Sequence, residues 1–408
     1  MRFFSSESVS AGHPDKMCDC ISDSILDACI TADPDARVAV EAFVKGLDPN
    51  SRDPPYSFIV IGGEITLAEG CSIDYEAIAR RAAADIGYTS IDVGMDATSK
   101  EACEVTVVIY LVRAVPGFMK GIVLAGGTGT RLWPMTRATS KQLLPVFDKP
   151  MIYYPLATLM LAGLRDILII STSRDLPQYE ELLGDGGQFG MRFSYKVQNQ
   201  PRGLPEAFII GEEFIGDNPV ALILGDNLFH GNGISNILQS CVANTVDTGR
   251  TNFFGVAVPD PERFGVAEIS DDGTIISIEE KPDTPKSDIA VTGLYMYSHD
   301  VVKIAKNLKP SRRGELEISE LNMHYVNSGM ARINVLGRGV TWLDTGTPES
   351  LHSASAFIQA VQKNTGVRVA CLEEVAWRMG FIEKVELSSA VGKYPSSSHY
   401  GNYVKSLK

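Results

Sequence analysis

The chain has 408 residues and a formal net charge of −13, a length that predicts more than one domain. Residues 1–118 carry nine Lys and Arg against nineteen Asp and Glu, and neither part has the basic surface that nucleic-acid binding needs, so we expect no nucleic-acid partner. No apolar run approaches a membrane span, no signal-peptide pattern opens the chain, and the seven cysteines lack paired metal spacing. These features predict a cytoplasmic protein with reduced thiols and no membrane partner.

The first predicted element is a helix that begins near Asp15. Apolar residues recur every four positions from Met17 to Cys29 and form one stripe. Aspartates at the same spacing form a second stripe, which indicates a solvated acidic face. Asp15 differs from the other aspartates because it lies beside His13 and Lys16 in the first turn, where a metal or a phosphate could be held.

The rest of the N-terminal segment indicates a small α+β domain. Apolar runs predict strands at residues 38–44, 58–61 and 104–111, and residues 72–86 predict an amphipathic helix. The segment Gly62–Thr66 is predicted to turn out of the second strand.

Four motifs in this segment resemble the N-terminal domain of S-adenosylmethionine synthetases. They are Gly12-His-Pro-Asp-Lys16, Glu41 with Val44-Lys45, Gly62-Gly-Glu-Ile-Thr66 and Gly94-Met-Asp-Ala97. The resemblance implies that His13 touches ATP phosphates and Asp15, next to Lys16, binds Mg²⁺. It also implies that Glu41 lies near a monovalent cation and Glu64 near methionine.

The likeness ends near residue 100, before the two further domains that this family needs for catalysis. We therefore expect residues 1–114 to form a catalytically incomplete domain with a structural, oligomerising or ligand-sensing role. A bifunctional protein that also makes S-adenosylmethionine is the alternative. Residues 115–118 are the predicted linker, because Pro116-Gly117 interrupts the pattern there.

The C-terminal segment, residues 119–408, opens with a buried-strand pattern that ends in a glycine-rich loop. Gly126, Gly127 and Gly129, with Thr128 between them, let the backbone turn sharply and present its amides to an anion. Arg131 and, further on, Lys141 add cations suited to phosphate. The loop fits neither a Walker A motif nor a dinucleotide fingerprint, and a plain strand-to-helix turn is the alternative when the loop is considered alone.

Strands and helices then alternate, which predicts an α/β, Rossmann-like fold with a mixed, mostly parallel sheet. Asp226 and Asp344 each come directly after a buried-strand pattern, at the end where such sheets bind ligands. Each aspartate could cap a turn, or the two could share a Mg²⁺, which prefers hard oxygen ligands.

The motifs of this segment resemble the sugar-1-phosphate nucleotidyltransferases, and among them the thymidylyltransferases. The motifs are Leu124-Ala-Gly-Gly-Thr-Gly-Thr-Arg131, Ser140-Lys-Gln-Leu-Leu-Pro145, Gly225-Asp-Asn-Leu228 and Trp342-Leu-Asp-Thr-Gly-Thr347. The resemblance favours the metal role for both aspartates. It implies a Mg²⁺-dependent enzyme that makes dTDP-glucose and pyrophosphate from dTTP and glucose 1-phosphate, the first step towards dTDP-deoxysugars such as dTDP-rhamnose.

The same resemblance assigns further substrate-binding residues. Gln142 belongs to the second motif, and Gln198 and Gly203 correspond to residues that read the thymine edge. Residues around the sugar phosphate correspond to Gly265, Glu280, Lys281 and Val291. Leu204-Pro-Glu206-Ala differs from the usual Leu-Ala-Gln-Ala, and Glu206 adds a negative charge near the expected base pocket.

The resemblance also implies a homo-oligomer, a tetramer or a dimer, with a dTDP-sugar as feedback regulator. The implied reaction needs positioning and charge neutralisation rather than a general base, because the attacking phosphate is already ionised. We expect Arg131, Lys141, Asp226 and Lys281 to be the catalytic residues. UTP in place of dTTP, and a protein that only senses nucleotides, are the alternatives.

Overall fold

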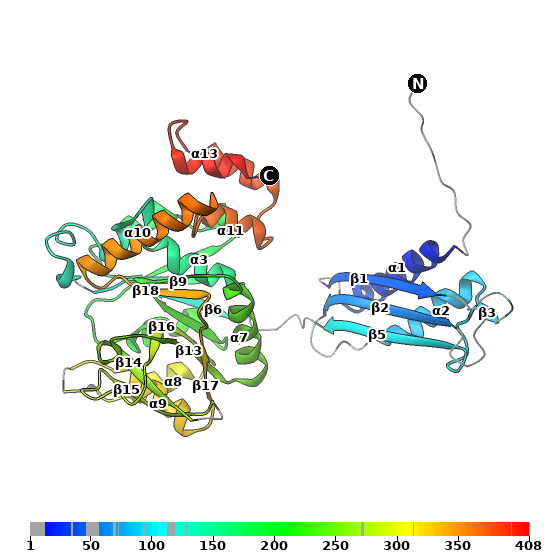
Figure 1. The fold of residues 1–408 in the computed structure, drawn as a ribbon, viewed down its shortest axis with the longest axis horizontal. Helices are drawn as coiled ribbons and strands as arrows, with labels where there is room; N and C mark the ends of the chain where they lie inside the picture. Colours follow the sequence, from blue (N-terminus) through cyan, green and yellow to red (C-terminus); the bar gives the residue numbers. More distant parts are fainter. Residues whose placement is uncertain are drawn as a thin grey trace. The chain divides into compact units, whose positions relative to one another are not determined.

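The computed structural model divides the chain into two compact units, Met1–Pro116 and Gly117–Lys408 (Figure 1). It describes residues 13–33, 36–45, 57–67, 71, 73–90, 92, 95–111, 119–127, 129–270, 273–312, 314–392 and 394–407. The predicted linker at 115–118 lies outside these residues. Among the described residues, no helix has both the length and the apolar character needed to cross a membrane.

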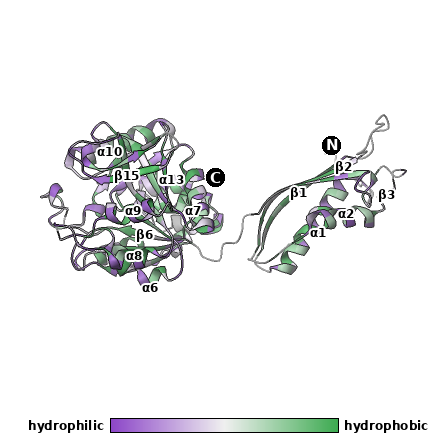
Figure 2. Cartoon of the chain, turned by 90° about the horizontal axis from the view of Figure 1, so that it is seen from below, coloured by the Kyte–Doolittle hydropathy of each residue, from purple (hydrophilic) through white to green (hydrophobic). Residues whose placement is uncertain are grey.

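The N-terminal unit is a three-stranded sheet with two helices on one face (Figure 2). Apolar side chains of both helices, Met17 and Ala79 among them, pack on buried strand residues such as Ile59 and Ile61. The strands lie in the order β1-β2-β5, with β1 antiparallel and β5 parallel to β2. The elements are α1 (Pro14–Ala32), β1 (Arg37–Lys45), β2 (Ser57–Thr66), α2 (Tyr75–Ile86), the short pair β3 (Thr89–Ser90) and β4 (Met95–Asp96), and β5 (Cys103–Leu111).

The predicted turn at Gly62–Thr66 is wrong, because β2 continues through it. Gly63 pairs with Val40 of β1, and a Cβ on Gly63 would lie 2.0 Å from the Ala39 carbonyl oxygen. Glycine here permits a close backbone approach between strands, which is its other common role in a strand.

The C-terminal unit is built on a large mixed sheet in which β16 and β15 run against the other strands. The prediction of a mixed, mostly parallel α/β sheet is confirmed. The main strand order is β10 (Arg192–Val197), β9 (Asp166–Ser171), β6 (Lys120–Leu124), β11 (Val220–Leu224), β16 (Ile289–Tyr297), β13 (Thr251–Ala257) and β17 (Ala331–Val335), with β14 (Gly265–Ile269) and β15 (Ile275–Glu280) beside β16.

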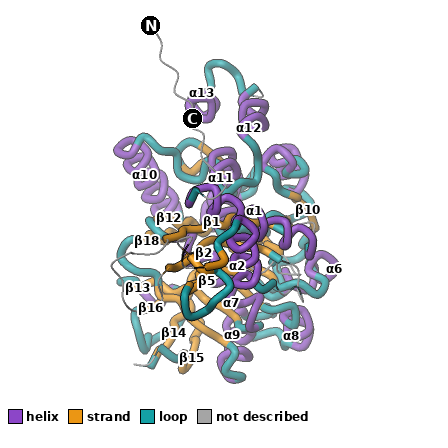
Figure 3. The backbone as a smooth tube through the Cα atoms, turned by 90° about the vertical axis from the view of Figure 1, so that its right-hand side faces the viewer, coloured by secondary structure: helices purple, strands orange, loops and turns teal. Residues whose placement is uncertain are grey.

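Helices cover both faces of this sheet, so that the strands lie between them (Figure 3). Successive strand residues point to opposite faces, so Val123 joins one apolar core and its neighbour Ile122 the other. One face carries α3 (Tyr153–Leu161), α4 (Leu176–Leu183), α7 (Ile234–Thr248) and α11 (Leu372–Arg378); the other carries α5 (Glu206–Ile210), α6 (Glu212–Ile215), α8 (Val301–Asn307) and α9 (Ile318–Asn327).

The C-terminal helices complete the unit. Leu351 and Ile358 of α10 pack in a smaller core with Leu228 and Tyr154. Beside this core, β12 pairs antiparallel with β18. These elements are β7 (Pro145–Val146), β8 (Lys149–Pro150), β12 (Asn227–Gly231), β18 (Val340–Asp344), α10 (Pro348–Thr365), α12 (Lys384–Val391) and α13 (His399–Ser406).

A buried carboxylate ties α13 to α11. Glu373, only 2% exposed, accepts hydrogen bonds from the hydroxyls of Tyr394 and Tyr400, the latter at 2.7 Å. Beside it, the Tyr403 hydroxyl donates to Glu374 at 2.6 Å. We call Glu373, Tyr394 and Tyr400 the C-terminal clasp.

Candidate active site

The glycine-rich loop after β6 forms the centre of the candidate site. β6 and β11 are adjacent and parallel, so this loop and Asp226, which follows β11, meet at the same edge of the sheet. Gly127 and Gly129 have φ angles of 99° and 57°, in the left-handed region that glycine adopts without strain. Thr128, a predicted site residue, lies outside the described residues.

A hollow of about 310 Å³ lies beside this loop, and we call it the first hollow. Four charged side chains line it, two cationic and two acidic. Lys141 forms an ion pair with Asp226, and both side chains are largely buried. The first hollow brings together the predicted residues Gly126, Gly127, Gly129, Arg131, Lys141, Gln142, Asp226 and Asp344.

The two aspartates of the first hollow are close neighbours. Asp344 ends β18 and pairs with Asn227 in the ladder, directly after Asp226. Burial and then repulsion from Asp226 raise the pKa of Asp344, while Lys141, Arg263 and Arg131 oppose the shift. Two carboxylates that repel one another form a fitting oxygen donor pair for a divalent cation.

The described residues contain no group of three or more His, Cys, Asp or Glu side chains that could hold a metal ion. A cation held by the two aspartates would therefore take its other ligands from water or from substrate oxygens.

Asn227 fixes the Asp226 carboxylate, and sequence reasoning missed this role. The Asn227 Oδ1 atom accepts hydrogen bonds from the Trp342 indole at 2.7 Å and from the Gly293 amide at 2.9 Å. Its Nδ2 atom donates to Asp226 Oδ1 at 3.0 Å. Asn227 is next to Asp226 within the Gly225-Asp-Asn-Leu228 motif. Its position beside an aspartate that is predicted to bind a metal ion is the only hint of this role in the sequence.

Gln142 is held in a similar way. It is 5% exposed, and its Oε1 atom lies 2.9 Å from the Ser140 hydroxyl and 3.5 Å from the Tyr179 hydroxyl. Its amide group is therefore fixed at the wall of the first hollow.

A second hollow of about 280 Å³ adjoins the first. Gly126 and Gly127 line both hollows, so the loop backbone is their common wall. The second hollow brings together the predicted residues Gln198, Gly203, Glu280 and Lys281.

Close backbone contacts shape the second hollow. A Cβ on Gly203 would lie 2.0 Å from the Leu316 carbonyl oxygen, and an isolated parallel bridge joins these two residues.

The cation of the second hollow is Lys281. Its side chain is 46% exposed, and its Nζ atom lies 3.3 Å from Glu280.

Gly265 and Val291 lie beside the second hollow but are not among its lining residues. Gly265 pairs with Glu280 on one side and with Val291 on the other. The three residues are therefore neighbours across the β15-β14-β16 ladder, although they are far apart in the sequence.

The predicted residues of the N-terminal unit lie at the start of α1, on β1 and on β2. His13 caps α1 by accepting from the Asp15 amide at 3.3 Å, and Asp15 and Lys16 are exposed. Glu41 is exposed on β1 opposite Gly62, while Glu64 of β2 pairs with Ala39.

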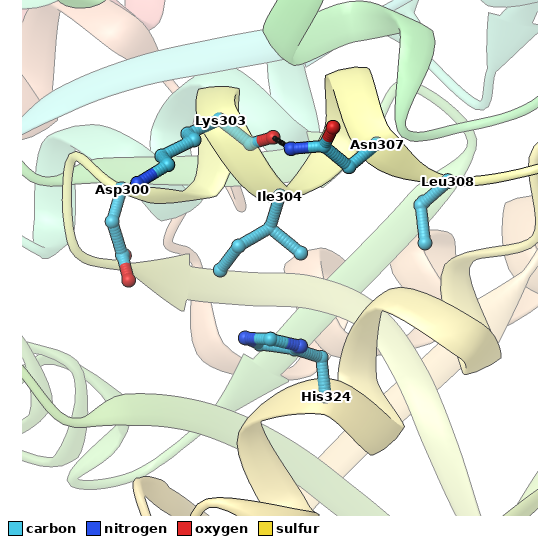
Figure 4. Close-up of a pocket in the computed structure, with 6 residues that line it drawn as sticks. All are labelled: Asp300, Lys303, Ile304, Asn307, Leu308 and His324. Atoms are coloured by element: carbon cyan, nitrogen blue, oxygen red, sulfur yellow. Dashed lines mark hydrogen bonds between the residues drawn. The ribbon is translucent and has the colours of Figure 1, made fainter.

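Another pocket lies between α8 and α9, and none of the predicted residues line it (Figure 4). Its polar side chains are Asp300, Lys303, Asn307 and His324. The Asn307 amide donates to the Lys303 carbonyl of its own helix at 2.8 Å. This pocket is separate from the two hollows at the carboxyl end of the sheet.

Comparison with known families gives two matches. Residues 120–361 match the family model "Nucleotidyl transferase". Residues 1–111 match the model "S-adenosylmethionine synthetase, N-terminal domain".

Curated relatives match the C-terminal part of the chain. A glucose-1-phosphate thymidylyltransferase of Neisseria gonorrhoeae is 55% identical over 289 residues, which cover 71% of this chain and 99% of the relative. One of Actinoplanes sp. is 50% identical over 289 residues, covering 71% of this chain and 94% of the relative.

Solved structures agree with these relatives. A structure from Bacillus anthracis, provisionally assigned as a glucose-1-phosphate thymidylyltransferase, aligns with a TM-score of 0.54 and 42% identity over 59% of this chain and 94% of its own. A UDP-glucose pyrophosphorylase complexed with UDP-glucose aligns with a TM-score of 0.52 and 26% identity, covering 60% of this chain and 99% of its own.

Proposed function

Because this chain belongs to the nucleotidyl transferase family, we propose that its C-terminal unit joins dTTP and glucose 1-phosphate to give dTDP-glucose and pyrophosphate. The chain is a homologue of glucose-1-phosphate thymidylyltransferases at 50–55% identity. The observation that carries the proposal is the pair of adjoining hollows, one lined by two aspartates and two cations and the other by an amide and a lysine.

The reaction brings two phosphate groups together, so its main requirement is charge neutralisation. Arg131 and Lys141 neutralise the triphosphate and the leaving pyrophosphate in the first hollow, and the amides of Gly126, Gly127, Thr128 and Gly129 bind its oxygens. Gln198 and Gly203 contact the base, and Gln142 binds the nucleotide from the wall of the first hollow. On the sugar-phosphate side, Lys281 holds the phosphate that attacks the α-phosphorus, and Gly265, Glu280 and Val291 form its surroundings.

A magnesium ion fits the donor set of the first hollow. Asp226 and Asp344 would hold it, and when bound it supplies positive charge to the phosphate oxygens of the nucleotide. The chain's own part is to keep the two carboxylates side by side, which the β12-β18 pairing and Asn227 do.

The test is pyrophosphate release from the full chain with Mg²⁺, glucose 1-phosphate and each of dTTP, UTP and ATP, beside a reaction with ATP and methionine. We expect strong release with dTTP. Release with UTP at an equal or greater rate would favour the alternative suggested by the UDP-glucose pyrophosphorylase structures. If no nucleotide gives pyrophosphate, the proposal is contradicted, and a protein that only senses nucleotides is favoured.

We also propose that residues 1–114 are a non-catalytic accessory domain, joined by a linker at 115–118 to the transferase at 119–408. Of the described candidate side chains, Asp15 and Lys16 are exposed on α1 and Glu41 is exposed on β1, so we expect no pyrophosphate from ATP and methionine. Release of pyrophosphate from ATP and methionine would overturn this assignment. A homo-oligomer, a dTDP-sugar regulator and a cytoplasmic location stay predictions.

A further inference from the structure

The backbone of Phe264 holds one side of the candidate site. Phe264 directly precedes β14, and its carbonyl oxygen accepts a hydrogen bond from the Lys281 amide at 2.9 Å. The neighbouring pair, Gly265 and Glu280, belongs to the β14-β15 ladder, so this bond extends the ladder by one position. The start of β14 therefore supports the backbone of the lysine that lines the second hollow.

Lys281 needs this support because its backbone conformation is strained. Its φ angle of 45° lies in the left-handed region, which residues with a side chain seldom occupy. Such a conformation persists only where the surrounding structure imposes it. Consecutive side chains of a regular strand point to opposite faces, yet Glu280 and Lys281 both line the second hollow. The left-handed turn at Lys281 departs from strand geometry, and the bond to Phe264 helps to fix it.

The ring of Phe264 reaches the other side of the site through Trp342. The two rings pack edge to face, with their centroids 5.1 Å apart and an angle of 62° between their planes. The Trp342 indole N–H donates to Asn227 at 2.7 Å, and the Asn227 amide donates to Asp226 at 3.0 Å. A continuous line of contacts thus runs from the Phe264 ring to the Asp226 carboxylate.

The residue before Phe264 gives separate evidence that this segment lies close to the two aspartates. The Arg263 guanidinium lies 5.3 Å from the centroid of the Phe264 ring. Burial raises the pKa of Asp344, and Arg263 is one of the cations that oppose this shift. Phe264 itself is not among the residues that line either hollow. We therefore expect it to act on substrates through the groups that it holds rather than by direct contact.

Resting on the proposed function, we infer that Phe264 is a positioning residue that ties the two sides of the site together. Its backbone holds Lys281 on the sugar-phosphate side, and its ring holds Trp342 and, through Asn227, Asp226 on the nucleotide side. The transition state requires the attacking phosphate and the nucleotide to be aligned. A loss of this tie should therefore affect the reaction step more than the binding of either substrate.

The first test compares kcat and KM in the wild-type chain and in Phe264→Ala. Removal of the ring frees Trp342, so we expect kcat to fall roughly tenfold to a hundredfold while KM for dTTP changes by about threefold at most. Phe264→Tyr keeps the ring and should recover most of the wild-type kcat. Phe381→Ala is the matched control, because Phe381 is also partly buried, stacks on an arginine (Arg165, at 4.4 Å) and lines neither hollow.

A double-mutant cycle tests the route through Trp342. Trp342→Phe keeps an aromatic ring but removes the N–H that donates to Asn227. If Phe264 acts through this donor, the variant with both substitutions should lose little more kcat than the more impaired single variant. Losses of kcat that multiply in the double variant would overturn the inference.

Two further measurements do not depend on turnover. The chain has three tryptophans, so isotope labelling of tryptophan gives three indole N–H signals in NMR spectra, and Trp342→Phe identifies the signal of Trp342. We expect Phe264→Ala to shift this signal and to speed hydrogen exchange at the Lys281 amide, and Phe381→Ala to do neither.

An unchanged Trp342 signal or an unchanged kcat in Phe264→Ala would overturn the inference. An equal loss of kcat in Phe381→Ala would also overturn it, because that result marks a merely structural role. A wild-type chain that releases no pyrophosphate with any nucleotide, while Phe264→Ala still alters the Trp342 signal and the Lys281 exchange, would sustain the positioning role and contradict the proposed function.

Discussion

Asn227 links three segments at the level of single side chains. Its partners Gly293 and Trp342 lie 66 and 115 residues away in the sequence. Only the fold brings them together, so no local pattern predicts the contact. The sequence did predict the glycine-rich loop and the two aspartates, because each follows a strand and has residue types that suit phosphate or a metal ion. It also predicted the two cations, because their charge suits phosphate.

The first residue-scale prediction concerns Gly293. A Cβ here would lie 2.7 Å from Asn227 Oδ1 and 2.7 Å from the Leu224 side chain. We expect Gly293→Ala to displace Asn227 from Asp226, to cost about 1–3 kcal/mol of unfolding free energy and to lower turnover. Gly337→Ala is the control, because nothing lies within 4 Å of its added Cβ. Denaturant unfolding and pyrophosphate release measure both effects, and equal behaviour of the two variants would contradict the prediction.

The second prediction at the residue scale concerns the charged side chains that line the first hollow. Asp226→Asn keeps the shape of the side chain but removes its charge, and Lys141 loses its ion-pair partner. We expect turnover to fall roughly 10²–10³-fold while the circular dichroism spectrum is retained. Asp217→Asn, on an exposed turn, should leave both unchanged. Near-normal turnover in Asp226→Asn would remove Asp226 from the proposed machinery.

At the scale of elements, strands were the most predictable parts. The runs that gave β6, β9 and β11 are short, apolar and β-branched, as buried strands usually are. The error at Gly62–Thr66 arose because two adjacent glycines usually mark a turn. Here they admit a neighbouring strand at close range, which depends on a partner far away in the chain.

The prediction at the scale of elements concerns the C-terminal clasp and its effect on helix α13. Glu373→Ala would leave the half-buried hydroxyls of Tyr394 and Tyr400 without their acceptor. We expect a loss of about 3 kcal/mol in unfolding free energy and faster hydrogen exchange in α13. Glu181→Ala, an exposed carboxylate of α4, is the control. Hydrogen exchange followed by mass spectrometry checks the result, and unchanged protection of α13 would show that apolar packing alone holds this helix.

At the scale of the whole molecule, buried tyrosines predict how stability depends on pH. Burial raises the pKa of Tyr154, Tyr179 and Tyr297. In the unfolded chain they ionise near pH 10, whereas the folded chain keeps them protonated. The unfolded state thus binds fewer protons above that pH, and stability falls as the pH rises.

We expect unfolding free energy to drop by ~1.4 kcal/mol per such tyrosine for each pH unit above about pH 10. Chemical unfolding between about pH 8 and 11, with tyrosinate absorbance as a second signal, measures the drop. Tyr154→Phe should reduce the slope of unfolding free energy against pH by the contribution of one tyrosine. A flat profile, or tyrosinate that forms before unfolding, would contradict the prediction.

The shared wall between the two hollows has a consequence for inhibitor design. Because Gly126 and Gly127 line both hollows, a short tether suffices to connect a fragment that occupies one hollow with a fragment that occupies the other. Tethering makes the second contact intramolecular, with an effective concentration on the order of millimolar for a short flexible linker. Two weak fragments joined across these glycines should therefore bind far more tightly than either fragment alone.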